Sequence, residues 1–118
     1  MSQAGTGRPD APFEPSKVDL VSISADGSTV NLYIVADQPL TGSDVQLRSL
    51  QEKIHNYVVY VLDGQMSREL PQTSGLAWRI VIDSQGGPPD ARTSQVVSTI
   101  TEAVRRYGGD LAVQESGQ

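Results

Sequence analysis

The 118-residue chain contains no cysteine and has only one histidine, one tryptophan and one phenylalanine. The absence of thiols excludes disulfides, zinc–thiolate sites and cysteine nucleophiles, and it leaves the redox compartment undetermined. No run approaches the roughly 18 apolar residues of a membrane span. Residues 1–17 also lack the apolar stretch of a signal peptide. We therefore expect no membrane association and a cytoplasmic location.

Basic residues are scarce as well, because 9 Lys and Arg face 14 Asp and Glu and the net charge is −5. Phosphate backbones repel such a surface. The pair Arg105-Arg106 falls at the expected end of a helix, where positive charge complements the helix macrodipole. Nucleic-acid binding is not expected. An acidic antidote-like protein that neutralises a basic partner stays open as an alternative that rests on net charge alone.

The length suits a single domain that can bury a core without a metal or disulfide staple. Residues 1–16 hold three prolines and two glycines among small polar residues. Such a segment cannot bury enough apolar surface to offset its ordering entropy. We predict a disordered tail over 1–16, one domain over 17–114 and a frayed end over 115–118.

Four strands are predicted. Val18–Ser24 and Thr29–Ala36 flank Asp26-Gly27, a strong hairpin signal because both turn positions tolerate positive φ. The second run alternates apolar and polar residues, whereas the first changes phase, which indicates a β-bulge or burial on both faces. Two further strands are expected at Leu76–Asp83 and Leu111–Val113. Trp78 falls on the inward phase of the third strand, so we expect it in the core.

A long helix is predicted over Asp44–Asp63. Ser43 and Gln46 form a capping-box pattern at its start, and Gly64 suits its end. On a helical wheel Ser49 and Asn56 lie opposite an apolar stripe. The stripe consists of Leu47, Leu50, Ile54, Tyr57, Val58, Val61 and Leu62.

Residues 65–75 contain a proline and a glycine and are predicted to form a loop. A second helix is expected over Ala91–Tyr107, with Asp90 as its N-cap and a Gly-Gly pair after its end. Six apolar residues of this helix follow helical spacing on one face. They are Val96, Val97, Ile100, Ala103, Val104 and Tyr107.

The resulting order is β-β-α-β-α-β. We predict an α+β fold, a two-layer sandwich in which two helices cover one face of a four-stranded sheet. The one-sided alternation in the second and third strands favours this fold, because a parallel sheet covered on both faces has continuously apolar strands.

The segment Leu50–Gln65 reads LQEKIHNYVVYVLDGQ and resembles the LQEKI-x-x-Y-x-x-F/Y-I/V-x-x-GQ phrase of a bacterial family of unknown function. The strands VNLYIVAD and WRIVID and the GG-x-L ending also fit, so the resemblance extends from Val18 to Val113. It implies the fold and its boundaries, and it carries no catalytic residue over to this chain.

No motif indicates a cofactor, a metal or a catalytic group. His55, the single histidine, has Glu52 one turn before it, but two groups fall short of the three or four ligands of a metal site. Asp19, Asp37 and Asp83 stand at strand ends without the spacing of a cation-binding loop. The Gly86-Gly87 loop is followed by prolines, which lack the N–H donors that a phosphate site needs.

Two surfaces are candidates for protein contacts. Tyr33 and Arg79 lie on the outward phase of their strands and would join Asn31, Val35 and Val81 on an open sheet face. Val59 and Tyr60 flank the apolar stripe of the long helix, where a folded-back loop or a partner would cover them.

We therefore expect a non-enzymatic protein-interaction module that acts as a homodimer or binds a protein partner. The alternative from another class is a small-ligand-binding or enzymatic domain with a pocket between sheet and helices.

Overall fold

The computed structural model describes residues 20–36 and 39–115. The predicted tail, the predicted strand start at Val18 and the end of the chain after residue 115 lie outside these ranges. The elements are β1 (Leu20–Ile23), β2 (Thr29–Ala36), α1 (Asp44–Leu62), α2 (Gln65–Glu69), a 3-10 turn (Pro71–Thr73), β3 (Ala77–Ser84), α3 (Ala91–Arg106) and β4 (Asp110–Glu115).

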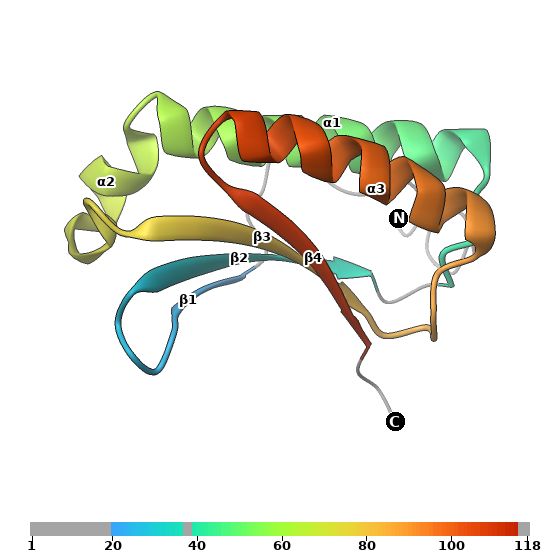
Figure 1. Ribbon diagram of the computed structural model, residues 1–118, viewed down its shortest axis with the longest axis horizontal. Coiled ribbons are helices and arrows are strands. Elements are labelled where there is room, and N and C mark those ends of the chain that lie inside the picture. Colours follow the sequence, from blue (N-terminus) through green and yellow to red (C-terminus); the bar gives the residue numbers. More distant parts are fainter. Residues whose placement is uncertain (1–19, 37–38, 116–118) are drawn as a thin grey trace, which may run out of the picture.

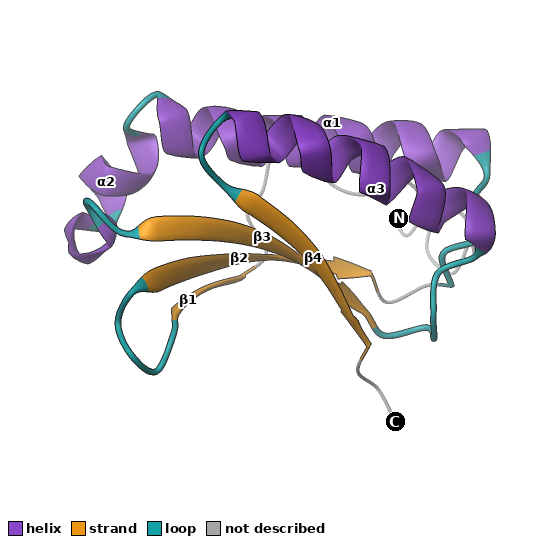
Figure 2. Ribbon diagram, in the orientation of Figure 1, coloured by secondary structure: helices purple, strands orange, loops and turns teal. Residues whose placement is uncertain are grey.

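The four strands form one mixed sheet in the order β1-β2-β3-β4. β1 is antiparallel to β2, whereas β2, β3 and β4 are parallel. Each parallel connection moves one strand further in the same direction, and such crossovers share one hand. Both long helices therefore lie on the same face of the sheet, as Figures 1 and 2 show. The predicted α+β class and four-stranded sheet are confirmed.

The core lies between this helical layer and one face of the two central strands. Val30 pairs with Trp78, Leu32 with Ile80 and Ile34 with Ile82, and all six are buried. Burying each aliphatic side chain contributes about 1.5–3 kcal/mol. The inward position predicted for Trp78 is confirmed. The helices add Leu50, Ile54, Tyr57, Val97 and Val104 to the core.

α1 begins where the sequence predicts, but its cap differs from the expected capping box. The Ser43 hydroxyl accepts a hydrogen bond from the Gln46 N–H at 3.2 Å. The Gln46 side chain does not return this contact. Its Nε2 donates to the Pro39 carbonyl and its Oε1 accepts from the Thr41 N–H, both at 2.9 Å. The buried Gln46 side chain therefore holds the loop before α1 against the helix and does not complete the capping box.

The loop predicted over 65–75 is wrong in part, because α2 and the 3-10 turn occupy most of it. The Gln65 N–H donates to the Asp63 carboxylate at 2.9 Å, and the Gln65 side chain reaches Glu69 at 3.0 Å. Met66 is buried, which anchors this single turn of helix against the core. Pro71 then opens the 3-10 turn. A helix of five residues is too short to produce a periodic pattern in the sequence.

The start of α3 joins the loop that precedes α1. Asp90 caps α3 as predicted, because its carboxylate accepts from the Thr93 N–H at 2.9 Å. The Asp90 N–H donates to the Leu40 carbonyl at 3.1 Å. Arg92 Nη1 donates to the Gly42 carbonyl at 2.9 Å. The two crossover loops are thereby fastened together at one end of the sheet.

β1 pairs with β2 residue for residue from Leu20 to Ile23, so no bulge interrupts this part of the strand. Val21 pairs with Leu32 and lies on the helical side, whereas Leu20 pairs with Tyr33 on the other face. Leu20 is 56% exposed. Within the described strand, the phase change therefore reflects an apolar residue on each face, and Leu20 is not buried.

We predict that Gly42→Ala destabilises the fold more than Gly27→Ala. Both glycines have positive φ, so both variants carry a backbone cost of about 1–2 kcal/mol. A Cβ at Gly42 would also lie 2.5 Å from the Asp90 carboxylate, whereas nothing lies within 4 Å of a Cβ at Gly27. Displacing the α3 cap adds about 1 kcal/mol. Urea unfolding of both variants measures the difference, and equal losses would contradict the close approach of the two loops.

Candidate functional site

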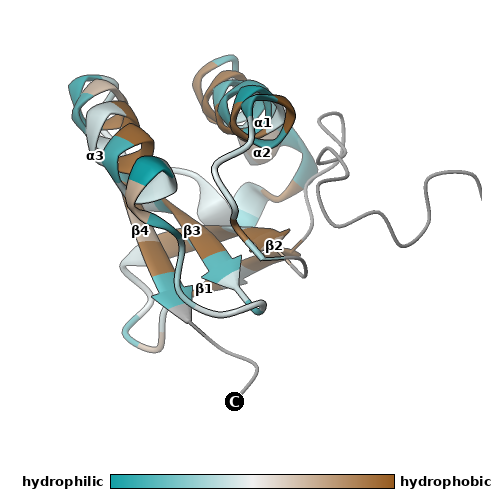
Figure 3. Ribbon diagram, turned by 90° about the vertical axis from the view of Figure 1, so that its right-hand side faces the viewer, coloured by the Kyte–Doolittle hydropathy of each residue, from teal (hydrophilic) through white to brown (hydrophobic). Residues whose placement is uncertain are grey.

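A groove of about 420 Å³ runs between α1 and α3 and opens to solvent. Figure 3 shows the two helices side by side above the sheet. A second hollow of about 350 Å³ continues the groove toward the start of α3, because both hollows share Gln51 and Ile100. The main groove is lined by Gln51, Ile54, His55, Val58, Val59, Leu62, Ile100, Ala103, Val104 and Tyr107.

The floor and the rim of this groove are both apolar. Ile54, Val58 and Val104 form a buried floor. At the rim, Leu62 is 52% exposed and Tyr107 is 58% exposed. The sequence placed Leu62 on the apolar stripe of the long helix and Tyr107 on the apolar face of the second helix, but it did not indicate that both residues are exposed. A helical wheel shows which residues lie on the same face of one helix. It does not show that the last turns of two neighbouring helices leave a channel between them.

The predicted flank of Val59 and Tyr60 divides between two environments. Val59 is 43% exposed and lines the groove. Tyr60 turns toward α2, and its hydroxyl donates to Glu69 Oε1 at 3.0 Å. Burial, followed by this hydrogen bond to an acidic acceptor, raises the pKa of Tyr60 above its ordinary value. α2 therefore partly covers Tyr60, and Val59 stays open to solvent.

His55 lies on the rim of the groove and is exposed. Among the described residues, no group of three or more His, Asp or Glu side chains is placed to hold a metal ion. Asp19 and Asp37 lie outside those residues. Asp83 accepts a hydrogen bond from the Gln85 side chain at 3.2 Å. In the Gly86-Gly87 loop, the Gly87 carbonyl accepts a hydrogen bond from the Ser84 hydroxyl.

The second candidate surface is the sheet face opposite the helices. Tyr33 and Arg79 both lie on it, because they alternate with buried core residues along β2 and β3. Arg79 is paired in register with Asn31, and its Nε donates to Asn31 Oδ1 at 3.2 Å. Val81 is the apolar centre of this face and is only 6% exposed. Tyr33 and Arg79 therefore lie on the sheet face opposite the helices, whereas Val59 lies on α1, on the other side of the molecule.

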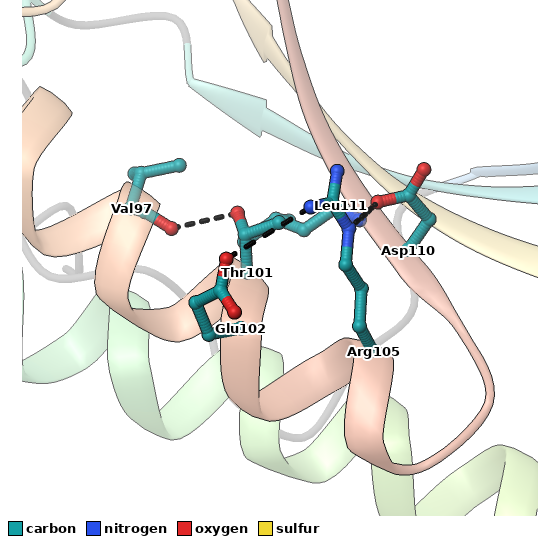
Figure 4. Close-up of polar contacts among 6 residues, drawn as sticks. All are labelled: Val97, Thr101, Glu102, Arg105, Asp110 and Leu111. Carbon is teal, nitrogen blue, oxygen red and sulfur yellow. Dashed lines mark hydrogen bonds and ion pairs between the residues drawn. The ribbon is translucent and has the colours of Figure 1, made fainter.

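One edge of the sheet face is polar and is joined to α3 (Figure 4). Asp110 accepts hydrogen bonds from the Leu111 N–H at 2.9 Å and from Arg105 Nε at 3.1 Å. These bonds, the first more than the second, hold the pKa of the Asp110 carboxyl below its ordinary value, and the positive charge of Arg79 contributes further. Arg105 also lies 3.9 Å from Glu102. The arginine at the helix end therefore has a local structural role.

Sequence reasoning missed a buried polar row on α1. Ser49, which the wheel placed opposite the apolar stripe, is 8% exposed, and Lys53 is 2% exposed. The Lys53 ammonium lies 6.0 Å from the centre of the Tyr57 ring, a distance at which a cation and an aromatic face attract. The Tyr57 hydroxyl donates to the Tyr33 carbonyl at 2.6 Å. In the sequence, only the four-residue spacing of Lys53 and Tyr57 indicated that these two side chains are neighbours on the helix.

We predict that Asp110→Asn lowers stability at neutral pH and has little effect in acid. Asparagine keeps an acceptor for the Leu111 N–H but loses the charge that Arg105 binds, a partly exposed pair worth up to about 1 kcal/mol. The folded pKa is depressed, so this stabilisation is present above the unfolded value of about 3.9 and is lost as pH falls through the folded value. Urea unfolding of both proteins at neutral and acidic pH measures the change. A difference that stays constant with pH would assign the effect to packing instead of charge.

No helix among the described residues has the length and apolar content that a bilayer crossing requires.

No curated protein and no solved structure matched the chain. The model of one protein family matches residues 12–116, and its description is a family of unknown function, DUF6572. A match of this extent covers both long helices and all four strands, and it confirms that the chain resembles a family of unknown function. The chain belongs to the DUF6572 family.

Proposed function

We propose that the protein is a non-enzymatic interaction module that binds an amphipathic helix of a partner protein in the groove between α1 and α3. The main support is the exposure of three large apolar side chains around one groove, namely Val59 at 43%, Leu62 at 52% and Tyr107 at 58%. Single exposed apolar residues are ordinary, whereas contiguous ones mark interfaces.

The walls of the groove favour a helical partner. Val59 and Leu62 are three residues apart on α1. Ile100 and Ala103 on α3, together with its C-cap Tyr107, follow helical spacing. A third helix packs its side-chain ridges into the channel between two such rows. Recognition of this kind uses apolar anchors at positions i, i+3 or i+4, and i+7 of the bound helix. We expect the partner segment to carry that pattern.

Electrostatics favours one direction for the bound helix. α1 and α3 each follow a strand of the parallel set, so the positive ends of both helix dipoles lie at the same end of the groove. The second hollow, which is the more polar part, contains Arg92 at that end, and Arg48 on α1 is exposed. Arg92 is itself paired with Asp44 at 2.7 Å, so the attraction for the negative C-terminal end of an antiparallel partner helix comes from the two helix dipoles and Arg48.

A small apolar ligand is the second candidate for the same groove. The volume of about 420 Å³ falls in the range of small-molecule sites, and His55 supplies a polar group at the rim. This pocket differs in position from the predicted one, since it lies between the two helices and not between helices and sheet.

A bacterial, cytoplasmic setting also belongs to the proposal. The resemblance of Leu50–Gln65 to a phrase of a bacterial family supports the bacterial origin.

We predict that a displayed library of random peptides, selected on the intact protein, enriches amphipathic helical sequences. Leu62→Glu should weaken their binding by at least tenfold, because a charge would enter an apolar wall at a cost above about 1.4 kcal/mol. Fluorescence anisotropy of a labelled peptide measures the affinity.

Val45→Glu is the matched control, since Val45 is 50% exposed on α1 but does not line the groove. The control should bind like the wild type. Peptides that bind equally to Leu62→Glu and the wild type, or a selection that yields no helical pattern, would contradict the proposed function. Displacement of a bound peptide by apolar fragments would favour the small-ligand candidate.

A further inference from the structure

The sheet face opposite the helices carries an apolar row that crosses all four strands. The register connects Leu20 to Tyr33, Tyr33 to Val81 and Val81 to Ala112. Leu20 is 56% exposed, Tyr33 and Ala112 are half-buried, and Val81 is nearly buried. Within the described residues no helix covers this row (Figure 1).

Opposite charges stand on the two sides of this apolar row. On β3, Arg79 comes two residues before Val81 and Asp83 comes two residues after it, and all three share the face opposite the helices. Four residues of strand separate the two charges by about 13 Å. Arg79 is held in place by Asn31, and in the described part of the chain its hydrogen bonding involves only Nε. Its charge already acts on Asp110, and its two terminal nitrogens can donate hydrogen bonds to a further anionic partner.

This pattern is complementary to itself. Consider a twofold axis that lies along the apolar row, between two copies of the sheet packed face to face. The rotation reverses the strand direction, so the apolar row of one copy meets that of the other. The same rotation brings Arg79 of each copy over Asp83 of the other copy. An axis along the strands would instead bring Arg79 over Arg79, which is unfavourable.

We propose that the protein forms a twofold homodimer through the sheet face opposite the helices, with the apolar row at the centre and two reciprocal Arg79–Asp83 ion pairs at its sides. Closed twofold interfaces use the same patch on both subunits, which is the property that this face has. Face-to-face sheets pack about 10 Å apart, close enough for the row of side chains to interdigitate. This contact is independent of the groove, which lies on the other side of each subunit.

Sedimentation equilibrium over a range of concentrations tests the dimer. The wild type should reach twice the monomer mass of 12.6 kDa. Arg79→Glu and Asp83→Arg should each weaken association by at least tenfold, because each places like charges opposite one another. The double variant Arg79→Glu/Asp83→Arg should restore it, since the exchanged charges still pair across the axis. Arg48→Glu is the control, because it makes the same charge change on the helical layer.

The cysteine-free chain allows a second test that does not depend on the charge variants. Ala112→Cys places a thiol in the apolar row, next to its own copy across the axis. A short bismaleimide should link this variant into dimers, and Ala25→Cys, in the exposed β1–β2 turn, should stay monomeric. A monomeric wild type, a double variant no better than the single ones, or linkage of Val59→Cys in place of Ala112→Cys would overturn the proposed interface.

Discussion

The parallel pairing of β2 with β3 is the constraint on which the rest of the molecule depends. Eight residue pairs, from Thr29↔Ala77 to Ala36↔Ser84, align the central strands. Parallel neighbours cannot be joined by a tight turn, so the chain must cross over the sheet between them. α1 is that crossover, and the next parallel pair requires α3 in the same role. The hand shared by both crossovers then places the two helices on one face.

This one-sided arrangement explains both exposed surfaces. Two helices over a twisted four-stranded sheet meet the sheet with their apolar faces, but they meet each other over only part of their length, which leaves the groove with Val59 and Leu62 on its wall. The opposite sheet face receives no helix in the described residues. Its strands still alternate, so Tyr33, Arg79 and Val81 stand there together. The topology therefore determines where each surface lies, and the side chains on that surface determine what it can bind.

Local rules predicted the parts of the fold that depend on neighbouring residues. The hairpin turn at Asp26-Gly27, the hydrogen bond from the Gln46 N–H to the Ser43 hydroxyl and the Asp90 cap each involve groups within a few residues, and all three form. The reciprocal half of the capping box does not form, and only Gly27 of the two turn residues has positive φ. Alternation also gave the inward face of β3 and the outward positions of Tyr33 and Arg79. These features are encoded by short-range sterics and hydrogen bonding, which a single sequence displays directly.

Features that depend on distant partners were not predicted. Whether β2 runs parallel or antiparallel to β3 is decided by the crossover, which no local pattern reports. The exposure of Leu62 and Tyr107 was not predicted, because a helical wheel cannot show what lies opposite a helix. The burial of Lys53 beside Tyr57 depends on the surroundings of α1, whereas composition predicts an exposed lysine. α2 is a single turn held by Met66, too short for periodicity to reveal.

The central strand pair also has a consequence for the speed of folding. Asn31 and Arg79 are neighbours in space but are separated by 48 positions in the chain. Bringing such distant segments together carries a loop-closure entropy that grows with the logarithm of the intervening length, by about 0.6 kcal/mol per doubling. Forming α1 first shortens the intervening chain, since a helix rises only about 1.5 Å per residue. The rate at which the sheet assembles is therefore tied to the stability of α1 in the still unfolded chain.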